Sequence, residues 1–434
     1  MPLRTHTSDL TVQSSGLVPV RTALANGVVV VVKETPKIPA VTIHLAVRSG
    51  SVCDPADAPG AMHLMSRVID RGTASRSAAE IAEDLDSRGI TLTIAVTQHL
   101  FSLACTCLAE DFDAVFALMG DIVMSPAFPD AELATRKAEV MTAIRQDEDS
   151  PAIRAVEALM ALLYPGHPYG CPTKGTAEVV GRMTRERLSE LHGRRFAPSE
   201  LSAVVVGDEA VERARDVAAR VFDAWRAPPP AAVALPPVGP ATRRQRLVIP
   251  MMNKAQADVA YGFTAVTRTD PTYYACSLMN NILGQYSMGG RLGDSIRERQ
   301  GMAYYAFSSL ETNVAEGPLM VRAGVSPENV GRAVASIDEE IGRFAREGAT
   351  ARELRESQQY LVGSMPRALE TNAGIALFLQ TAEFFGLGLD YDVRLPERLR
   401  AVTLDEVADA ARRLLDPERA SLVIAGPYQD PGVG

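Results

Sequence analysis

The sequence has few cysteines and few aromatic residues. Five of its 434 residues are cysteine, and Phe, Trp and Tyr together make up 6%. No Cys-x-x-Cys pair occurs, so the sequence indicates neither a cysteine zinc motif nor a disulfide framework. We expect the cysteines to be small buried apolar residues. Cys105 and Cys107 should share one face of a strand because they are two positions apart.

Long apolar runs and an excess of basic residues are also missing. No run is long enough to span a bilayer, so we expect no membrane partner. Residues 1–7 lack the apolar core of a secretory signal, which makes the cytoplasm the expected location. The net charge of −9 argues against nucleic-acid binding. A content of 47% hydrophobic and 22% charged residues is typical of folded globular chains, and the length predicts at least two domains.

A helix predicted between Gly60 and Gly72 lacks residues that a metal-binding helix needs. An H-x-x-E-H helix places two His ligands one turn apart, with the Glu beside them as general base. Here the same frame reads His63-Leu-Met-Ser66-Arg67. The cation of Arg67 cannot bind zinc, and the hydroxyl of Ser66 is a poor base near neutral pH. We therefore interpret His63 as a hydrogen-bonded helix residue rather than a ligand.

Hairpins alternate with blocks of helix along the first half. The Asn26-Gly27 turn precedes a valine strand over residues 28–32, and residues 41–47 are its expected antiparallel partner. His44 lies inside that second strand and should occupy a structural position on one sheet face. A capping box over residues 77–80 predicts a short helix, and further helices are predicted over residues 110–124, 130–146 and 153–163. Strands that meet strands directly favour the α+β class with antiparallel sheets.

The two halves of the chain repeat each other. Each half ends with a Thr-capped helix, a proline that stops it, and a strand that closes at a glycine. The matching residues are each 219 positions apart: Thr184 and Thr403, Pro198 and Pro417, Gly207 and Gly426. We therefore predict two homologous domains, residues 1–226 and 241–434, joined by an extended proline-rich linker over residues 227–240. Each should be a mostly antiparallel sheet with helices packed on one face.

The order and spacing of these motifs resemble the pitrilysin/insulinase family of zinc metallopeptidases, the inverzincins. The resemblance covers nearly the whole chain. It rests on the valine strand after the Asn-Gly turn, on Gly60-x-x-His63 with its exit at Gly72, on the Gly-His-Pro-Tyr-Gly loop at residues 166–170, and on the closing strand at residues 205–208.

The resemblance allows each zinc ligand of the family to be compared with the residue at the matching position of this chain. Active members bind zinc through both His of H-x-x-E-H and through a distal Glu on a later helix. In this chain Arg67 replaces the second His, Ser66 replaces the base, and Ala143 falls in the position of the distal Glu. Glu139 and Glu148 are nearby in sequence, and we expect them on other faces of that helix. The implied conclusion is that the chain has no catalytic zinc site.

A second motif lies in residues 289–305, where a helix is followed by a glycine turn and a strand. In active complexes of the family, an Arg and a Tyr seven positions apart reach the substrate from the C-terminal domain. Arg297 and Tyr304 have this spacing, and both can donate hydrogen bonds to a peptide carbonyl or a developing oxyanion. The alternative is that Arg297 forms a surface ion pair and Tyr304 packs in the sheet. The segment at residues 281–290 is shorter than the glycine-rich flap of related subunits, so we expect no flap.

The resemblance implies a non-catalytic subunit of a two-subunit peptidase. Such a subunit binds the peptide substrate and forms half of a closed chamber. Zinc would belong to a catalytic H-x-x-E-H paralogue, while this chain would hold no cofactor and would not be an enzyme by itself. One alternative is a purely structural or interaction protein of the same fold. Another is an enzyme that is active alone, with an unusual metal set that includes His63.

Overall fold

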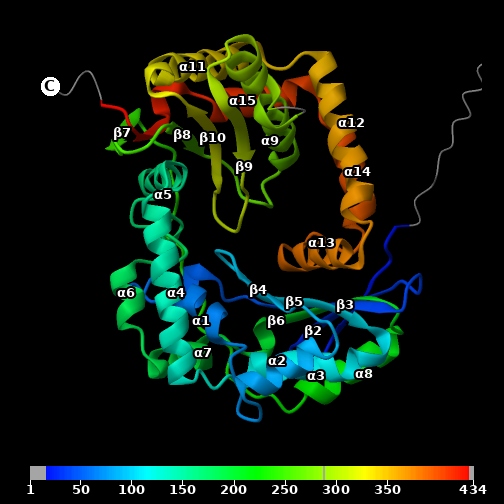
Figure 1. Cartoon of the computed structure of the whole chain (residues 1–434). Helices are drawn as coiled ribbons and strands as arrows, with labels where there is room; N and C mark the ends of the chain where they lie inside the picture. The colour runs from blue at the N-terminus through cyan, green and yellow to red at the C-terminus, as the bar shows by residue number, and fades with distance from the viewer. Residues whose placement is uncertain (1–15, 287–288, 430–434) are drawn as a thin grey trace, which may run out of the picture.

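The valine strand that follows the Asn26-Gly27 turn lies in a six-stranded sheet. A computed structural model describes residues 16–286 and 289–429 of the chain (Figure 1). The strands of the first sheet are β1 (Val20–Ala23), β2 (Val29–Glu34), β3 (Ala40–Val47), β4 (Thr93–Val96), β5 (Phe101–Leu108) and β6 (Leu201–Gly207). Their order is β1-β2-β6-β3-β5-β4, and every neighbouring pair is antiparallel except β2 and β6.

The predicted pairing of residues 28–32 with residues 41–47 is wrong. Strand β6 lies between β2 and β3. The physical reason is its apolar sequence, Leu-Ser-Ala-Val-Val-Val-Gly, which is buried along nearly its whole length. A strand that is apolar on both faces belongs in the middle of a sheet.

The helices of the first half pack mainly on one face of this sheet. They are α1 (Ala61–Val68), α2 (Ala78–Asp86), α3 (Phe112–Met124), α4 (Asp130–Glu148), α5 (Pro151–Leu163), α6 (Ala177–Arg182), α7 (Arg185–Arg195) and α8 (Val211–Phe222). The capping box of α2 is present as predicted, with the Ser77 side chain and the Glu80 side chain each bonded to the other residue's backbone N–H. The predicted helices over residues 110–124, 130–146 and 153–163 correspond to α3, α4 and α5.

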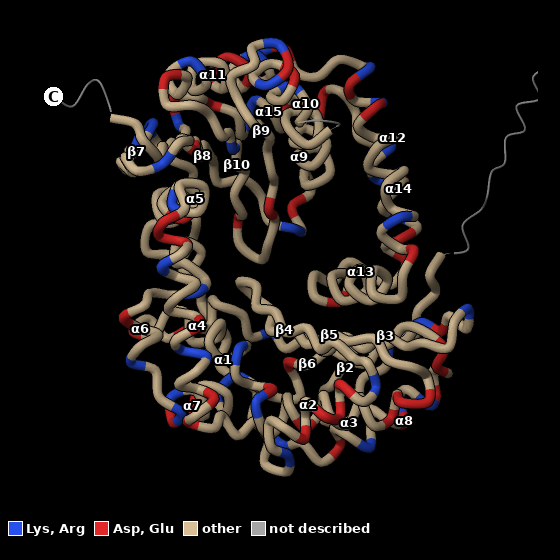
Figure 2. Tube along the Cα trace, viewed as in Figure 1, with Lys and Arg blue, Asp and Glu red and all other residues tan. Residues whose placement is uncertain are grey.

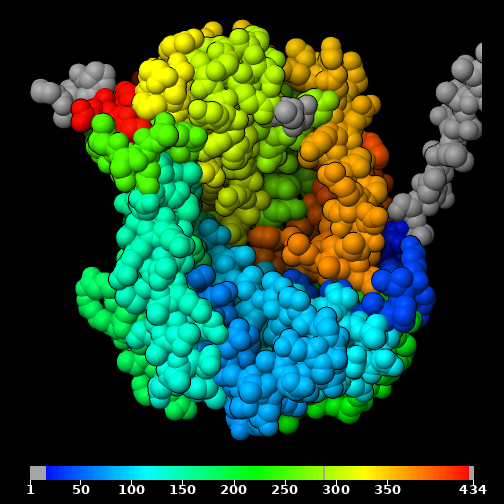
Figure 3. Space-filling view, viewed as in Figure 1, coloured from blue at the N-terminus to red at the C-terminus, as the bar shows by residue number. Residues whose placement is uncertain are grey.

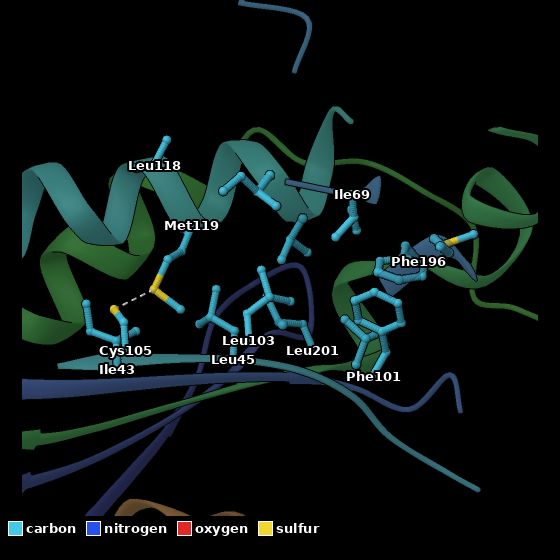
Figure 4. Packing of buried hydrophobic residues seen from close by; sticks show 14 of the residues in the cluster. Ile43, Leu45, Ile69, Phe101, Leu103, Cys105, Leu118, Met119, Phe196 and Leu201 are labelled. Atoms are coloured by element: carbon cyan, nitrogen blue, oxygen red, sulfur yellow. Dashed lines mark hydrogen bonds between the residues drawn. The ribbon is translucent and has the colours of Figure 1, made fainter. Parts of the chain in front are cut away.

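Alternating residues of the central strands form the core of the first half. Ile43 and Leu45 of β3 lie beside Leu103 of β5, opposite Met119 of α3 (Figure 4). The expectation for the strand cysteines is confirmed, because Cys105 and Cys107 are both buried on this helix-facing side.

The other cysteines follow the expectation less closely. Cys276 is buried, Cys53 is partly buried, and Cys171 is exposed. Cys171 departs from the prediction because it lies in an irregular loop just after a short helical turn rather than in a strand or a long helix.

The second sheet repeats the first. Its strands are β7 (Gln245–Pro250), β8 (Ala257–Thr264), β9 (Ala303–Leu310), β10 (Pro318–Val325) and β11 (Ser421–Gly426), in the order β7-β11-β8-β10-β9. This order matches β2-β6-β3-β5-β4, and only β7 and β11 are parallel. Its helices are α9 (Tyr273–Asn280), α10 (Gly290–Leu292), α11 (Val330–Glu347), α12 (Ala351–Ala368), α13 (Asn372–Phe384), α14 (Tyr391–Ala401) and α15 (Leu404–Leu414). The predicted duplication of an α+β domain is therefore confirmed.

The repeat extends to a backbone requirement at the end of the closing strands. Gly207 and Gly426 have φ values of +148° and +142°, which residues with a side chain rarely adopt. A Cβ at Gly207 would also lie 2.2 Å from the carbonyl oxygen of Ala40, the first residue of β3. Both domains therefore need glycine at this place for the same local reason.

The two halves exchange equivalent helices. Helix α5 of the first half packs on β8 and β11, and helix α13 of the second half packs on β3 and β6 (Figure 1). Leu159 and Leu163 of α5 lie against Gly262 of β8, where a Cβ would come within 3.0 Å of the Leu159 side chain. On the other side, the side-chain amide of Gln380 donates to Ser202 Oγ at 2.6 Å. Each sheet thus has its own helices on one face and part of its other face covered by the other half.

Residues 227–240 form neither helix nor strand, and the predicted domain boundaries around them stay a prediction. The tips of two equivalent hairpins also meet, since Asn313 Nδ2 donates to Gln98 Oε1 at 3.2 Å. Figure 3 shows a hollow between the two halves beside these contacts. Within the described ranges, no helix has both the length and the apolar character that crossing a bilayer requires.

Candidate functional site

The N-terminus of α1, the helix with the altered zinc frame, is held by a carboxyl that the sequence motifs did not reveal. Asp54 Oδ2 accepts from the N–H of Gly60 at 2.7 Å, and its Oδ1 accepts from the N–H of Met62 at 2.8 Å. Burial raises the pKa of Asp54 to about 7 in spite of these bonds. Asp54 could not be found from sequence because it caps the helix from a loop six residues before Gly60.

Ser66 lies on the buried side of α1 and is only 6% exposed. Its Oγ donates a hydrogen bond of 2.7 Å to the backbone carbonyl of His63. This hydroxyl is therefore bonded within its own helix, while Arg67 is exposed one position further along. Neither side chain replaces the base or the second ligand of a zinc site.

Two cations, Lys174 and Arg67, and one anion, Asp147, act electrostatically on His63. Burial, followed by the charges of Lys174 and Arg67, lowers the pKa of His63 to about 4. Lys174 Nζ forms an ion pair of 2.5 Å with Asp147 Oδ2. The imidazole is therefore neutral near pH 7, as a ligand would be, but two protein cations act on the place where a metal cation would bind.

Ala143 is on the side of α4 that faces α1. Helices α1 and α4 pack together. Asp147, one turn after Ala143, acts electrostatically on His63, and Glu139, one turn before it, interacts with Arg67. Positions four apart share a helix face, so Ala143 lies between these two residues, facing the altered frame.

The expectation that Glu139 lies on another face is therefore wrong. Its carboxylate is nevertheless exposed and bonded to Arg136 at 2.7 and 2.8 Å. Glu148 is exposed as well. In the described part of the chain, no three His, Cys, Asp or Glu side chains are grouped so that they could hold a metal. The residues at the altered frame do not fit a zinc ion.

The neutral state of His63 gives a testable pH dependence. The folded pKa of about 4 lies below the ordinary value of about 6.5, so the folded state resists protonation and stability falls as pH drops below 6.5. A His63→Gln variant should therefore lose about 1–2 kcal/mol less unfolding free energy than the parent between pH 7 and pH 5. Urea unfolding of both proteins at the two pH values measures this difference. Equal losses would contradict the neutral, desolvated histidine.

Arg297 and Tyr304 are placed by a helix, a turn and a strand, as predicted. Arg297 lies in a helical turn of π type, Gly293–Arg299, and Gly301 (φ +61°) makes the turn before β9. Arg297 donates to Glu298 Oε1 from Nε at 2.9 Å and from Nη2 at 2.7 Å. This is the ion pair of the alternative interpretation. Of the preceding segment at residues 281–290, residues 287 and 288 lie outside the described residues.

Tyr304 does not pack in the sheet. Its side chain is 72% exposed. The register pairs Ala303 with Val325 and Tyr305 with Gly324, which leaves Tyr304 as the extra residue of a β-bulge. Bulges re-aim side chains and are common next to functional sites.

Tyr305, the residue after Tyr304 in β9, belongs to a second polar pair that sequence reasoning missed. The hydroxyl of Tyr305 donates to Asp258 of β8, and burial raises the pKa of both groups. Arg322 of the neighbouring β10 lies 5.7 Å from the ring centroid of Phe307. Only the strand order, which puts β10 between β8 and β9, brings these residues together.

The duplicated fold and the altered helix define a class of protein: a two-domain zinc-peptidase homologue whose zinc-binding frame is altered. The family model described as "Insulinase (Peptidase family M16)" matches residues 29–177, and the model described as "Peptidase M16 inactive domain" matches residues 182–361. The chain belongs to this insulinase, or pitrilysin, family and is an inactive member of it.

Relatives of similar length support this assignment. The chain is 26% identical over 417 residues to a protein of Mycobacterium leprae named an uncharacterized zinc protease, covering 94% of this chain and 92% of the relative. It is 23% identical to a protein of Helicobacter pylori named a non-peptidase homolog, covering 88% and 87% of the two chains. A crystal structure described as a peptidase M16 inactive domain from Pseudomonas fluorescens superposes with a TM-score of 0.88 at 25% identity, covering 96% and 100%.

Proposed function

We propose that this chain is the substrate-binding and chamber-forming subunit of a heterodimeric zinc metallopeptidase that cleaves peptides. The partner would be an H-x-x-E-H paralogue that holds the zinc. One contrast carries the proposal. The altered frame has Ser66 and Arg67 in place of the base and the second ligand, and the charges of Lys174 and Arg67 act on His63, whereas a β-bulge presents Tyr304 to solvent. The residues at the frame suit a metal poorly, but a residue able to assist a partner's site is exposed.

The positions of two edge strands support peptide binding. Strand β4 ends the first sheet and β9 ends the second, and both lie toward the space between the halves (Figure 1). An exposed edge offers unpaired N–H and C=O groups to which an extended peptide can add as another strand. Strands β4 and β5 contain no charged residue, and Figure 2 accordingly colours both strands tan. The edges therefore suit an extended, uncharged peptide segment.

Arg297 and Tyr304 would complete the partner's site by donating hydrogen bonds to the substrate carbonyl. The pairing of Arg297 with Glu298 does not oppose this role. Glu298 is well exposed, and such pairs contribute only about 0–1 kcal/mol, so a substrate can replace them.

We predict that Arg297→Ala and Tyr304→Phe each reduce the kcat/KM of the assembled complex by about tenfold, the effect of losing one hydrogen bond of ~1.4 kcal/mol. The measurement is peptide cleavage by the paralogue mixed with each variant, with assembly followed by gel filtration. Arg299→Ala is a matched control, because Arg299 pairs with Asp294 in the same helical turn. Unchanged cleavage in both test variants would remove the role assigned to them.

A purely structural role is the second candidate. It is favoured by the Arg297–Glu298 ion pair, which gives the arginine a partner within the chain. The two candidates differ in one result: a structural protein would leave the cleavage rate of the paralogue unchanged when added to it. A cytoplasmic location stays a prediction for either candidate.

A further inference from the structure

Three residues form one row across the second sheet, next to Tyr304. The register pairs Gly324 of β10 with Tyr305 of β9 on one side and with Asp258 of β8 on the other. Adjacent strands lie about 4.8 Å apart, so the two outer residues are separated by about 9.6 Å. Their side chains span this distance, because the hydroxyl of Tyr305 donates to Asp258 Oδ1. Burial raises the pKa of Tyr305, so the hydroxyl keeps this hydrogen near pH 7.

Glycine at position 324 makes this bridge between β9 and β8 possible. A Cβ at Gly324 would lie 2.6 Å from Cε1 of the Tyr305 ring, well inside van der Waals contact. The ring therefore passes over the middle strand at the one residue that leaves room for it. The far end of the bridge is held as well, since Asp258 is only 4% exposed and its Oδ2 accepts from Gln256 Nε2 at 3.4 Å.

The bridge fixes the register of β9 beside the bulge. Tyr305 is paired with Gly324, and Ala303 fills the buried position beside Val325. In an uninterrupted strand Tyr304 would take that position, and its side chain would point to the sheet face opposite to that of Tyr305. Ala303 is only 8% exposed there, and a tyrosine ring in its place would overpack the core. Tyr304 is therefore left outside the ladder, where its side chain is exposed.

We propose that Tyr305, bonded to Asp258 across Gly324, is the positioning residue that presents Tyr304 to the partner's site. Tyr305 acts through its neighbour and not on the substrate: it holds the strand register, and the register exposes Tyr304. The functional part of this inference rests on the role proposed above for Tyr304. The presentation of Tyr304 is a property of the chain alone and can be measured without a partner.

The first measurement follows Tyr304 in the full chain by NMR. In a chain labelled with ¹³C-tyrosine, Tyr304→Phe identifies the Tyr304 signal among those of the eleven tyrosines. A soluble gadolinium chelate should broaden this signal strongly in the parent, because the side chain is exposed. Asp258→Ala removes the acceptor and Gly324→Ala displaces the Tyr305 ring. Each should shift or split the Tyr304 signal and reduce its broadening.

Two further variants separate the bridge from a general disturbance of the sheet. Asp258→Asn keeps an oxygen that can accept from Tyr305, so the Tyr304 signal should keep the shift and broadening of the parent. Gly331→Ala is the matched control for Gly324→Ala, because a Cβ at Gly331 of α11 would meet no atom within 4 Å. Urea unfolding confirms that each variant is folded.

The second measurement is peptide cleavage by the paralogue mixed with each variant. Asp258→Ala should lower kcat/KM about tenfold, as expected for Tyr304→Phe, and Asp258→Asn should retain most of the activity. Asp258→Ala combined with Tyr304→Phe should be no slower than Tyr304→Phe alone, because both changes remove the same hydrogen bond to the substrate. A merely structural role of Asp258 would make the two losses multiply.

Three results would overturn the proposal. The first is a Tyr304 signal that neither Asp258→Ala nor Gly324→Ala changes. The second is a signal that Asp258→Asn changes as much as Asp258→Ala does. The third is cleavage that falls with Tyr304→Phe but not with Asp258→Ala. If the signal changes as expected while Tyr304→Phe leaves cleavage intact, the role proposed for Tyr304 fails, and the presentation of Tyr304 by Tyr305 is supported.

Discussion

A chain that carries Ser66→Glu and Arg67→His together should still bind zinc poorly, and adding Ala143→Glu should raise its zinc affinity by on the order of 10²- to 10³-fold. Structural zinc sites with a complete ligand set have apparent binding free energies of about 10–16 kcal/mol, or about 3 kcal/mol for each ligand. The double variant supplies two ligands and a base, but the third ligand is missing. The triple variant supplies all three.

The position of Ala143 is the reason for expecting this recovery. It lies on the face of α4 between Glu139 and Asp147, whose charges act on Arg67 and His63. A carboxylate at residue 143 would therefore project toward the first turns of α1. Lys174 remains beside His63 in the triple variant and opposes the metal, so Lys174→Ala should add a further, smaller gain.

Competition with a chromogenic chelator measures the zinc affinities. Thr142→Glu, made in place of Ala143→Glu, is the matched control, because it adds the same charge at the adjacent, exposed position of α4. Tight zinc binding by the double variant would show that Ala143 is not the third position. Equal recovery with Thr142→Glu would show that added charge, rather than ligand geometry, explains the gain.

Local signals in the sequence identified most elements of the fold. The capping residues Ser77 and Glu80 located the start of α2, and the glycines that need positive φ at residues 207 and 426 revealed the repeat. These features depend on a few adjacent residues, so a sequence shows them directly. Strand order, in contrast, is not determined by adjacent residues. The place of β6 between β2 and β3 depends on contacts across more than 150 residues.

Some features of the candidate site could likewise be predicted from the sequence, and others could not. The loss of ligands at Ser66 and Arg67 could be read within one helical turn. Asp54, Lys174 and Asp147 could not, because loops and a second helix bring them to α1. The exposure of Tyr304 also depends on a bulge that the sequence of β9 alone does not reveal. Residues that act through distant contacts need the three-dimensional structure to be recognised.

The helix exchange predicts the largest loss of stability. Leu379 of α13 is 1% exposed and packs with Val31, Val204 and Val206 of the other half. We expect Leu379→Ala to lower the unfolding free energy by about 2–5 kcal/mol, since a buried Leu→Ala change loses apolar contact and leaves a cavity. Urea unfolding of the full chain measures this loss.

Leu377→Ala is the matched control on the same helix. Leu377 is 61% exposed, so its truncation should change stability by less than about 0.5 kcal/mol. A large loss in Leu379→Ala alone would mean that contacts between the halves stabilise the first sheet, although α13 comes from the second half of the chain. Equal effects of the two substitutions would instead mean that α13 rests loosely on that sheet. The halves would then be free to move apart, and the hollow between them would have no fixed width for a peptide.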